Sequence, residues 1–186
     1  TVEAAEAISG IDGSVDVSVL DALTTLVDHG LVQQLPQPDG SSRFRMLETV
    51  REYALEQLQA TGEEQDTRNR HLQWCLQHTE FLPRSAHSPA DRLSLFEVDH
   101  DNFRAALGWC THSPSTSEQG VQLAAQLSNF WAIRGHHREA RGWHAQLLPR
   151  SSARTVNRCD ALYWAGFLAL RQHDYAAAQS MLWQSL

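Results

Sequence analysis

The chain has 186 residues, of which 42% are hydrophobic and 20% charged, and its formal net charge is −7. It is too apolar for a disordered protein and long enough for one large or two small domains. All 15 of its basic residues are arginine. The lack of lysine excludes a phosphate-binding loop ending in Gly-Lys-Ser/Thr, a lysine Schiff base and a lysine general base.

Charge divides the chain near Gly62. Residues 1–62 hold ten acidic and three basic residues, whereas residues 63–186 hold 12 of each, so the first third carries the whole net charge. No apolar run approaches the roughly 18 residues of a membrane-spanning helix. The three cysteines are widely spaced and odd in number, which favours reduced thiols in a cytoplasmic protein.

A winged-helix domain is predicted over residues 1–62. A short helix over 2–9 ends at Gly10, and apolar residues at helical spacing predict a second helix over 15–29, ended by Gly30. Residues 31–47 form a predicted β-hairpin around the turn Pro38-Asp39-Gly40, and a helix over 48–61 follows. Helix 15–29 then has the position of a recognition helix, and the hairpin that of the wing.

The rest of the chain is predicted to be helical. The expected helices cover residues 63–82, ending at Pro83; a segment that begins after Ser88-Pro89 with Ser88 as its N-cap; and residues 100–111, 117–134, 137–148, 154–172 and 175–186. The residues of helix 100–111 expected to point inward are Phe103, Ala106, Leu107 and Cys110.

A helix pair recurs after 38 residues, with Ala140 matching Ala178 and Leu148 matching Leu186. Repeats of this length are typical of helical solenoids such as the tetratricopeptide (TPR) array. Gly166 and Ala178 are small enough to let two paired helices approach. The fold expected is therefore mainly α: a winged helix (1–62), a linking helical segment (63–115) and TPR-like repeats (116–186). Because the last repeat lacks a polar capping helix, we expect a piece of a longer protein.

Two stretches are not explained by periodicity: LETVREYA at 47–54 and DHDNFRAAL at 99–107. With them the chain resembles the large bacterial regulatory ATPases of the STAND type, many of which are LuxR-class transcriptional regulators. The resemblance implies an ATPase domain before the winged helix. This ATPase domain would be the intramolecular partner of the winged helix. ATP or ADP and Mg²⁺ would bind there, so no cofactor is expected within residues 1–186.

One departure from that family concerns the end of the wing. Many members have Met-His-Asp there, and the histidine senses the β-phosphate of the nucleotide. Met46-Leu47-Glu48 stands at the corresponding place, and leucine cannot donate a hydrogen bond. We therefore expect no nucleotide-contacting residue in this segment.

Direct DNA binding by this segment is not expected. Phosphate contacts need lysine or arginine. Residues 15–29 carry Asp16, Asp21 and Asp28 and no basic residue, and the wing adds Arg43 and Arg45. Packing against another domain is the alternative that this charge favours.

No metal or catalytic residue is predicted. His71, Cys75 and His78 share one helix face and could ligate zinc, but no fourth ligand accompanies them. Asp99-His100-Asp101-Asn102 is interpreted as a helix cap, because acidic residues and Asn accept hydrogen bonds from the free backbone N–H groups at the start of a helix. His136-His137 is interpreted as part of a solvated loop.

The candidate effector site is the groove that a TPR array presents to a ligand. Its predicted positions are Gln122, Ala125, Asn129, Ala132 and Ile133 in one repeat, and Asp160, Tyr163, Phe167, Leu170 and Arg171 in the next. The principal candidates are Asn129, Ile133, Asp160, Tyr163, Phe167 and Arg171. An apolar groove edged by arginine suits a peptide, a protein or a small apolar effector.

The function expected is regulatory and non-catalytic. Effector binding at the repeats would release a winged helix that holds the ATPase domain inactive. Two alternatives remain open: a free-standing TPR-type adaptor with a winged-helix-like module, and a DNA-binding winged-helix regulator.

Overall fold

The computed structural model describes residues 1–10, 18–37, 42–85 and 88–186, with only the backbone described at residues 82–85, 89, 90 and 92. The chain divides into an N-terminal unit, Thr1–Trp74, and a C-terminal unit, Cys75–Leu186. This division falls inside helix α4 (Glu64–Ser85). The domain boundaries predicted at residues 62 and 115 stay predictions. No helix among the described residues has both the length and the apolarity needed to cross a membrane.

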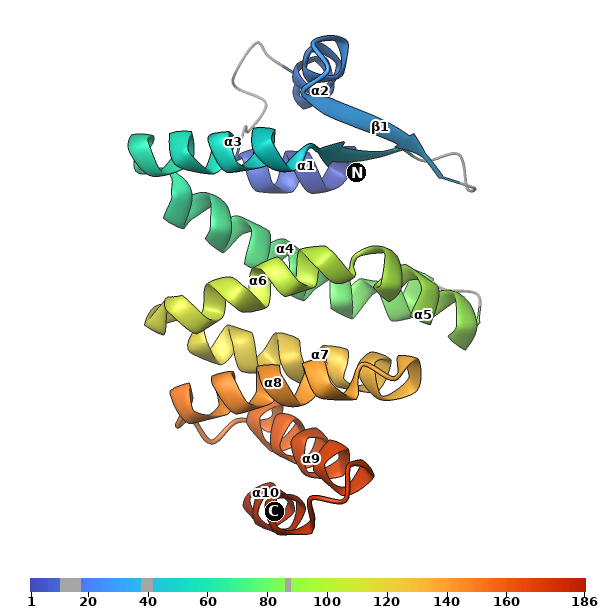
Figure 1. Cartoon of the computed structure of the whole chain (residues 1–186), viewed down its shortest axis with the longest axis vertical. Helices are drawn as coiled ribbons and strands as arrows, with labels where there is room; N and C mark the ends of the chain where they lie inside the picture. The colour runs from blue at the N-terminus through green and yellow to red at the C-terminus, as the bar shows by residue number, and fades with distance from the viewer. Residues whose placement is uncertain (11–17, 38–41, 86–87) are drawn as a thin grey trace. The chain divides into compact units, whose positions relative to one another are not determined.

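The N-terminal unit has the predicted order of helices and hairpin (Figure 1). Its elements are α1 (Val2–Ser9), α2 (Val19–Asp28), β1 (Val32–Pro36), β2 (Ser42–Met46), α3 (Glu48–Thr61) and the first part of α4. The predicted stops are confirmed: Gly10 and Gly30 have φ of 68° and 70°, a conformation that costs glycine little. The turn at 38–40 and the predicted helix start at 15–17 lie outside the described residues.

The hairpin is antiparallel, with Val32 opposite Met46 and Leu35 opposite Arg43. Val32 is the buried residue of β1, and its neighbours Gln33 to Pro36 are exposed. In the same unit, Arg70 of α4 donates from Nε to the carbonyl of Ile8 over 2.6 Å. This bond satisfies a carbonyl at the C-terminal end of α1, where helical partners are lacking.

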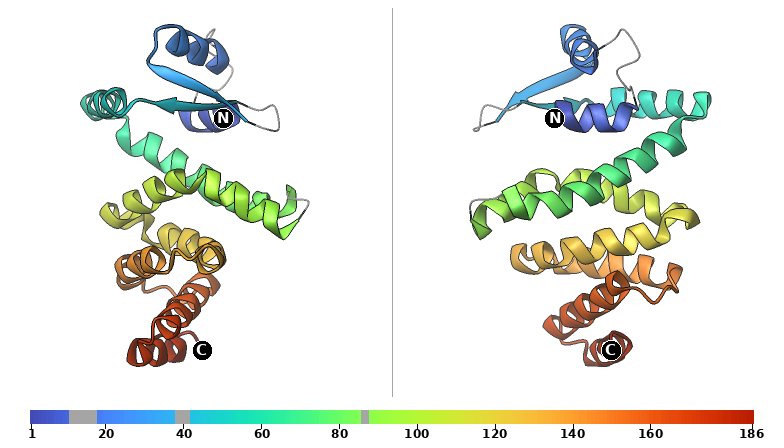
Figure 2. Two further views of the ribbon diagram at one scale, coloured as in Figure 1. Left: turned by 45° about the vertical axis from the view of Figure 1, so that its right-hand side comes forward. Right: turned by 180° about the vertical axis from the view of Figure 1, so that it is seen from behind.

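The C-terminal unit is a series of helices that pack on their sequence neighbours (Figures 1 and 2). Its elements are the end of α4, α5 (Pro89–Val98), α6 (His100–His112), the 3₁₀ turn η1 (Pro114–Thr116), α7 (Ser117–Arg134), α8 (His137–Leu147), the 3₁₀ turn η2 (Leu148–Arg150), α9 (Val156–Arg171) and α10 (Tyr175–Gln184). Helix α7 contacts α6, α8 and α9, and α9 contacts α10. The core is therefore continuous from one helix pair to the next.

The predictions for this unit are largely confirmed. Ser88 caps α5 by accepting a hydrogen bond from the backbone N–H of Asp91. The four inward residues predicted for α6 are all fully buried. The predicted bounds of α9 and α10 differ by one or two residues, and the largest difference is in α4, which continues past Pro83 to Ser85. A proline near the end of a helix removes one backbone hydrogen bond, and here that loss does not end the helix.

Small residues set how closely the helices approach, as the sequence predicts for Gly166. A Cβ built on Gly166 would lie 2.8 Å from Cγ of Leu182 on α10. A Cβ on Gly120 of α7 would lie 2.6 Å from Cβ of Cys110 on α6. Both distances are shorter than side chains tolerate, so these two helix contacts require glycine.

Candidate functional site

The predicted groove residues lie on two helices that pack against each other. Asn129 and Ile133 are exposed on α7, and Asp160, Tyr163 and Arg171 are exposed on α9, where Phe167 is half-buried. Spacings of three, four and seven residues place each set on one side of its helix. The structure thus offers two stripes, one on each of these two helices.

Residues of the two stripes line different cavities. Asn129 lines a cavity of about 270 Å³ together with Thr79, Phe96 and Gln126. Tyr163 lines a separate, mostly apolar cavity of about 380 Å³ with Leu182 and Trp183 of α10. These two cavities share no lining residue. Effector binding at these residues stays a prediction.

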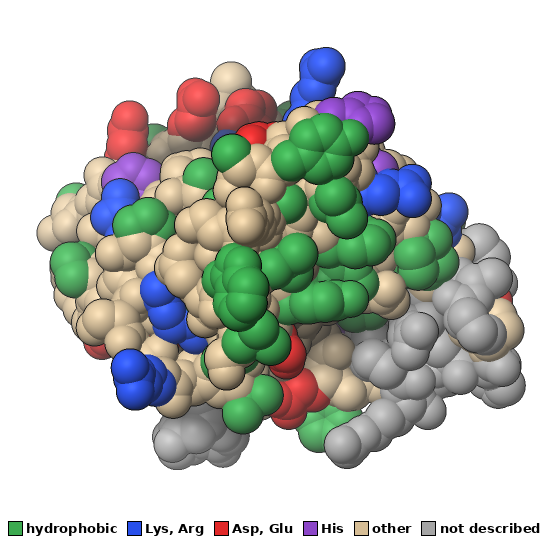
Figure 3. Space-filling model, turned by 90° about the horizontal axis from the view of Figure 1, so that it is seen from below, with side chains coloured by type: hydrophobic (Ala, Val, Ile, Leu, Met, Phe, Trp, Pro, Cys, Tyr) green, Lys and Arg blue, Asp and Glu red, His purple; other side chains and the backbone are tan. Residues whose placement is uncertain are grey.

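Apolar side chains gather at the α9–α10 end of the C-terminal unit (Figure 3). The exposed large apolar residues of these helices are Val156, Tyr163, Leu170, Tyr175, Trp183 and, just after α10, Leu186. Within α9 the ring of Trp164 contacts Tyr163 edge-on at 5.7 Å and Phe167 edge-on at 5.6 Å between centroids. This aromatic surface has the composition of protein-binding sites.

The largest of these cavities, about 660 Å³, was not anticipated from the sequence. It lies between the segment leading into α9 and the end of α10, and it is lined by Ser152, Ala153, Arg154, Thr155, Val156, Arg158, Cys159, Leu162, Gln184 and Leu186. Its lining belongs to two segments that are distant in sequence, so no local pattern marks it.

The helix face with His71, Cys75 and His78 has other partners in the structure. The buried Cys75 thiol donates to the Asn102 carbonyl at 3.8 Å, and burial raises the pKa of that thiol. His78 Nε2 lies 2.8 Å from Asp99 Oδ2. A protonated thiol is a poor metal ligand.

The capping role predicted for Asp99 is wrong in its detail. Asp99 is the N-cap residue of α6, but its side chain makes no capping hydrogen bond. Its carboxylate instead contacts His78 and accepts from Asn102 Nδ2 over 3.0 Å. The carboxylate therefore joins α6 to α4 instead of completing its own helix.

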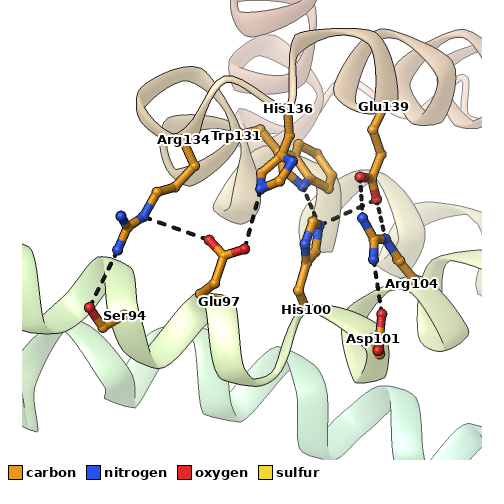
Figure 4. Close-up of polar contacts among 9 residues, drawn as sticks. All are labelled: Ser94, Glu97, His100, Asp101, Arg104, Trp131, Arg134, His136 and Glu139. Atoms are coloured by element: carbon orange, nitrogen blue, oxygen red, sulfur yellow. Dashed lines mark hydrogen bonds and ion pairs between the residues drawn. The ribbon is translucent and has the colours of Figure 1, made fainter.

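A polar cluster that sequence reasoning missed lies where α5, α6 and the α7–α8 turn meet (Figure 4). Ligand atoms of Glu97, His100 and His136 lie within 4.8 Å of one another. His136, interpreted from the sequence as solvated, points into this cluster. The residues are up to 39 positions apart in the chain, so neither their spacing nor their surroundings in the sequence identified them.

His100 is the buried member of this cluster, with 5% of its surface exposed. The indole N–H of Trp131 donates to its Nε2 over 3.1 Å, and Phe130 meets the imidazole edge-on at 5.1 Å. Burial lowers the pKa of His100. The ring is therefore held in one orientation, with Nε2 accepting the indole hydrogen bond.

Glu139 of α8 fixes the other side of the cluster. Its Oε1 lies 3.3 Å from His100 Nε2, and both of its oxygens accept hydrogen bonds from Arg104. These hydrogen bonds hold the pKa of the Glu139 carboxyl below its usual range. The carboxylate is therefore ionised and pre-positioned beside the imidazole.

The candidate DNA interface carries little positive charge. Within the described part of α2, Asp21 and Asp28 are the charged residues, and both are exposed. Arg43 and Arg45 lie on β2, where Arg45 is exposed. Tyr53 of α3 is 62% exposed, and no residue of α1, α2 or α3 is buried among those described.

Comparison with known proteins supports the N-terminal assignment. Residues 1–59 match the sequence profile of the winged helix-turn-helix domain family. The chain is also 39% identical over 136 residues to three proteins named "Putative HTH-type transcriptional regulator", two from strains of Mycobacterium tuberculosis and one from Mycobacterium bovis. The match covers 70% of this chain but spans only 15% of the length of those relatives. No solved structure matches the chain significantly.

Proposed function

We propose that this chain is the non-catalytic control segment of a multidomain transcriptional regulator. Its winged helix docks on another domain of the same protein, and its helix pairs bind an effector or partner. The observation that carries this proposal is a winged-helix unit with acidic residues in the recognition position and apolar residues left exposed. The regulatory role is supported by the names of the mycobacterial relatives.

Charge favours docking on protein over binding to DNA. Each phosphate contact requires a lysine or arginine, and these contacts supply most non-specific DNA affinity. The described part of α2 offers Asp21 and Asp28 instead. Facing DNA, these carboxylates would repel the phosphates, whereas arginines on another domain would attract them.

The exposed apolar side chains of the N-terminal unit also favour docking on protein. Three large hydrophobic residues of the N-terminal unit are exposed: Leu20 of α2, Leu47 at the N-cap of α3, and Tyr53 of α3. Docking on another domain would remove the apolar surface of these residues from water, which favours association. A domain of the same chain is the occupant we propose, because a linked domain binds at high effective concentration.

The partner domain we propose is the upstream ATPase implied by the resemblance to STAND regulators. In that arrangement the docked winged helix keeps the ATPase inactive, and effector binding at α7–α10 favours the undocked state. An effector shifts this equilibrium only by the difference in its affinity for the two states. The 15% coverage of the relatives leaves ample length for such a domain in them.

The test begins with the parent gene. A Gly-x-x-x-x-Gly-Lys-Ser/Thr loop between a strand and a helix, within about 300 residues upstream of Thr1, is expected. In the parent protein, Leu20→Asp and Tyr53→Asp should raise the basal ATPase rate by releasing the docked state, while Gln59→Asp, also exposed on α3, should not. An upstream region without such a loop would overturn the ATPase account.

DNA binding by the winged helix is the second candidate, and the match to the winged helix-turn-helix family favours it. It is tested by a gel shift of the chain at low salt against duplex DNA. We expect no shift at micromolar protein. A shift abolished by Arg43→Ala and Arg45→Ala together would instead establish the wing as a DNA contact.

A further inference from the structure

We propose that Glu97, His100 and His136 form a binding site for a divalent transition-metal ion, with Zn²⁺ as the best match. The site is separate from the groove stripes and from the docking role proposed for the winged helix. It rests on the juxtaposition of two imidazoles and one carboxylate at a junction of helix ends (Figure 4).

The spacing of the donors fits one ion. Zinc binds nitrogen and oxygen ligands at about 2.0–2.2 Å in tetrahedral geometry, so two of its ligands lie about 3.4 Å apart. Glu97 Oε1 and His136 Nε2 lie 3.6 Å apart. The rings of His100 and His136 have centroids 4.7 Å apart, with a 54° angle between their planes. Small side-chain adjustments therefore suffice to place one ion between the three residues.

The backbone holds these residues in place before any ion binds. Glu97 belongs to the last turn of α5, His100 is the first residue of α6, and His136 is the N-cap residue of α8. The backbone of His136 is itself fixed, because its N–H donates to the Trp131 carbonyl over 2.9 Å and its carbonyl accepts from Ala140 over 3.0 Å. Binding therefore requires little ordering of the chain.

The charge and protonation of the cluster suit a cation. His100 Nε2 accepts a hydrogen bond from the Trp131 indole, so Nε2 carries a lone pair and no proton, and an ion bound at Nε2 would displace the indole N–H. Glu97 Oε2 lies 3.7 Å from Arg134 Nε, while Oε1 is directed toward His136. One carboxylate oxygen is thus available to the ion without breaking the ion pair on the other.

A second carboxylate lies beside the His100 nitrogen that would bind the ion. Glu139 Oε1 is 3.3 Å from His100 Nε2, and Arg104 anchors Glu139 in turn. Because this carboxylate faces the nitrogen that would coordinate, it adds negative charge next to the ion. The three ligands leave a fourth coordination position for water.

The experiment uses the 186-residue chain with Cys159→Ser as a common background, which removes its exposed thiol. Zn²⁺ affinity is measured by competition with a chromophoric chelator, and Co²⁺ substitution reports the ligand field through its visible absorption bands. We expect one Zn²⁺ per chain and tetrahedral Co²⁺ bands without thiolate charge transfer. His136→Ala and Glu97→Gln should each weaken Zn²⁺ binding by more than tenfold, and Glu139→Gln by about tenfold.

The matched control is His112→Ala, which removes a histidine about 18 Å farther along α6 and should leave the affinity unchanged. Melting curves in chelator identify any variant that fails to fold, and Glu97→Gln preserves side-chain shape for that purpose. Added Zn²⁺ should also raise the melting temperature of the parent chain and not that of His136→Ala. Absence of binding at micromolar Zn²⁺, or an affinity in both ligand variants equal to that of the parent chain, would overturn the proposal.

Discussion

Arg104 on α6 and Glu139 on α8 stand 35 residues apart in the chain and form a two-pronged ion pair, with Nε donating to Oε1 and Nη2 to Oε2, each over 2.7 Å. This geometry uses the planar fork of arginine, which lysine cannot reproduce. It connects α6 directly to α8, across the turn between α7 and α8 and the whole length of α7 in sequence.

A double-mutant cycle should measure this pair. Arg104→Ala, Glu139→Ala and the double variant are expected to give a coupling free energy of about 1 kcal/mol, the upper end for partly exposed pairs. Urea unfolding provides the measurement. The same cycle between Arg104 and Asp101, a neighbour on α6 with a nearly fully exposed side chain, should give less than half that value. Equal couplings would show that the fork geometry contributes nothing.

Two glycine substitutions should change the stability in opposite directions. Gly120 lies in the close contact of α7 with α6, whereas Gly142 on α8 has open space beside it. Gly120→Ala should destabilise the chain by about 1–3 kcal/mol, because the new methyl would meet Cβ of Cys110, which is fixed to the backbone. Gly142→Ala on α8 should stabilise it by about 0.5–1 kcal/mol, since nothing lies within 4 Å of that position. Chemical denaturation of both variants tests the pair, and a Gly120→Ala variant as stable as the parent would contradict the packing.

Buried His144 predicts a loss of stability in acid. Its Nε2 lies 3.0 Å from Ser128 Oγ, its Nδ1 has no partner, and burial lowers its pKa to about 4. Ser128 donates to the Ala124 carbonyl, so Nε2 carries the proton and the unpartnered Nδ1 is an acceptor. The folded state therefore keeps this ring neutral while the unfolded state takes up a proton below its ordinary pKa of about 6.5.

The resulting stability is fully present above about pH 6.5 and is lost as the pH falls toward 4. Between pH 7 and pH 5 the parent should lose about 2 kcal/mol more than His144→Gln does. His112→Gln, at the exposed end of α6, should retain the parent's pH dependence. Denaturation curves at the two pH values decide the matter, and parallel losses in parent and His144→Gln would refute it.

The groove stripe on α9 predicts a binding loss without unfolding. Peptides selected from a displayed library on the chain should lose at least tenfold in affinity for Tyr163→Ala or Arg171→Ala, because an exposed aromatic ring and an arginine are typical anchors of peptide binding. The melting temperatures should stay near that of the parent, since both side chains are exposed. Arg138→Ala, exposed on α8, is the control. Unchanged affinity in both groove variants would exclude this stripe.

Local sequence patterns predicted the helix ends well where a capping or helix-terminating residue determines them. Helix α7 has the predicted bounds, and Ser88 caps α5 as expected. The extension of α4 past Pro83 could not be predicted. The sequence shows that Pro83 cannot donate a backbone hydrogen bond, but it does not show that the folded helix tolerates this loss. The cluster of Glu97, His100 and His136 escaped prediction for a different reason, since helix packing brings its members together and no sequence spacing records that packing.

The three cysteines differ in solvent exposure, so one of them can be labelled selectively. Cys75 and Cys110 are buried with raised thiol pKa values, whereas Cys159 is exposed and lines the cavity of about 660 Å³. Only thiolates react readily with maleimides, so a fluorophore added to the native protein would label Cys159 alone among the three. Its emission would report directly on any molecule that enters the space between the segment preceding α9 and the end of α10.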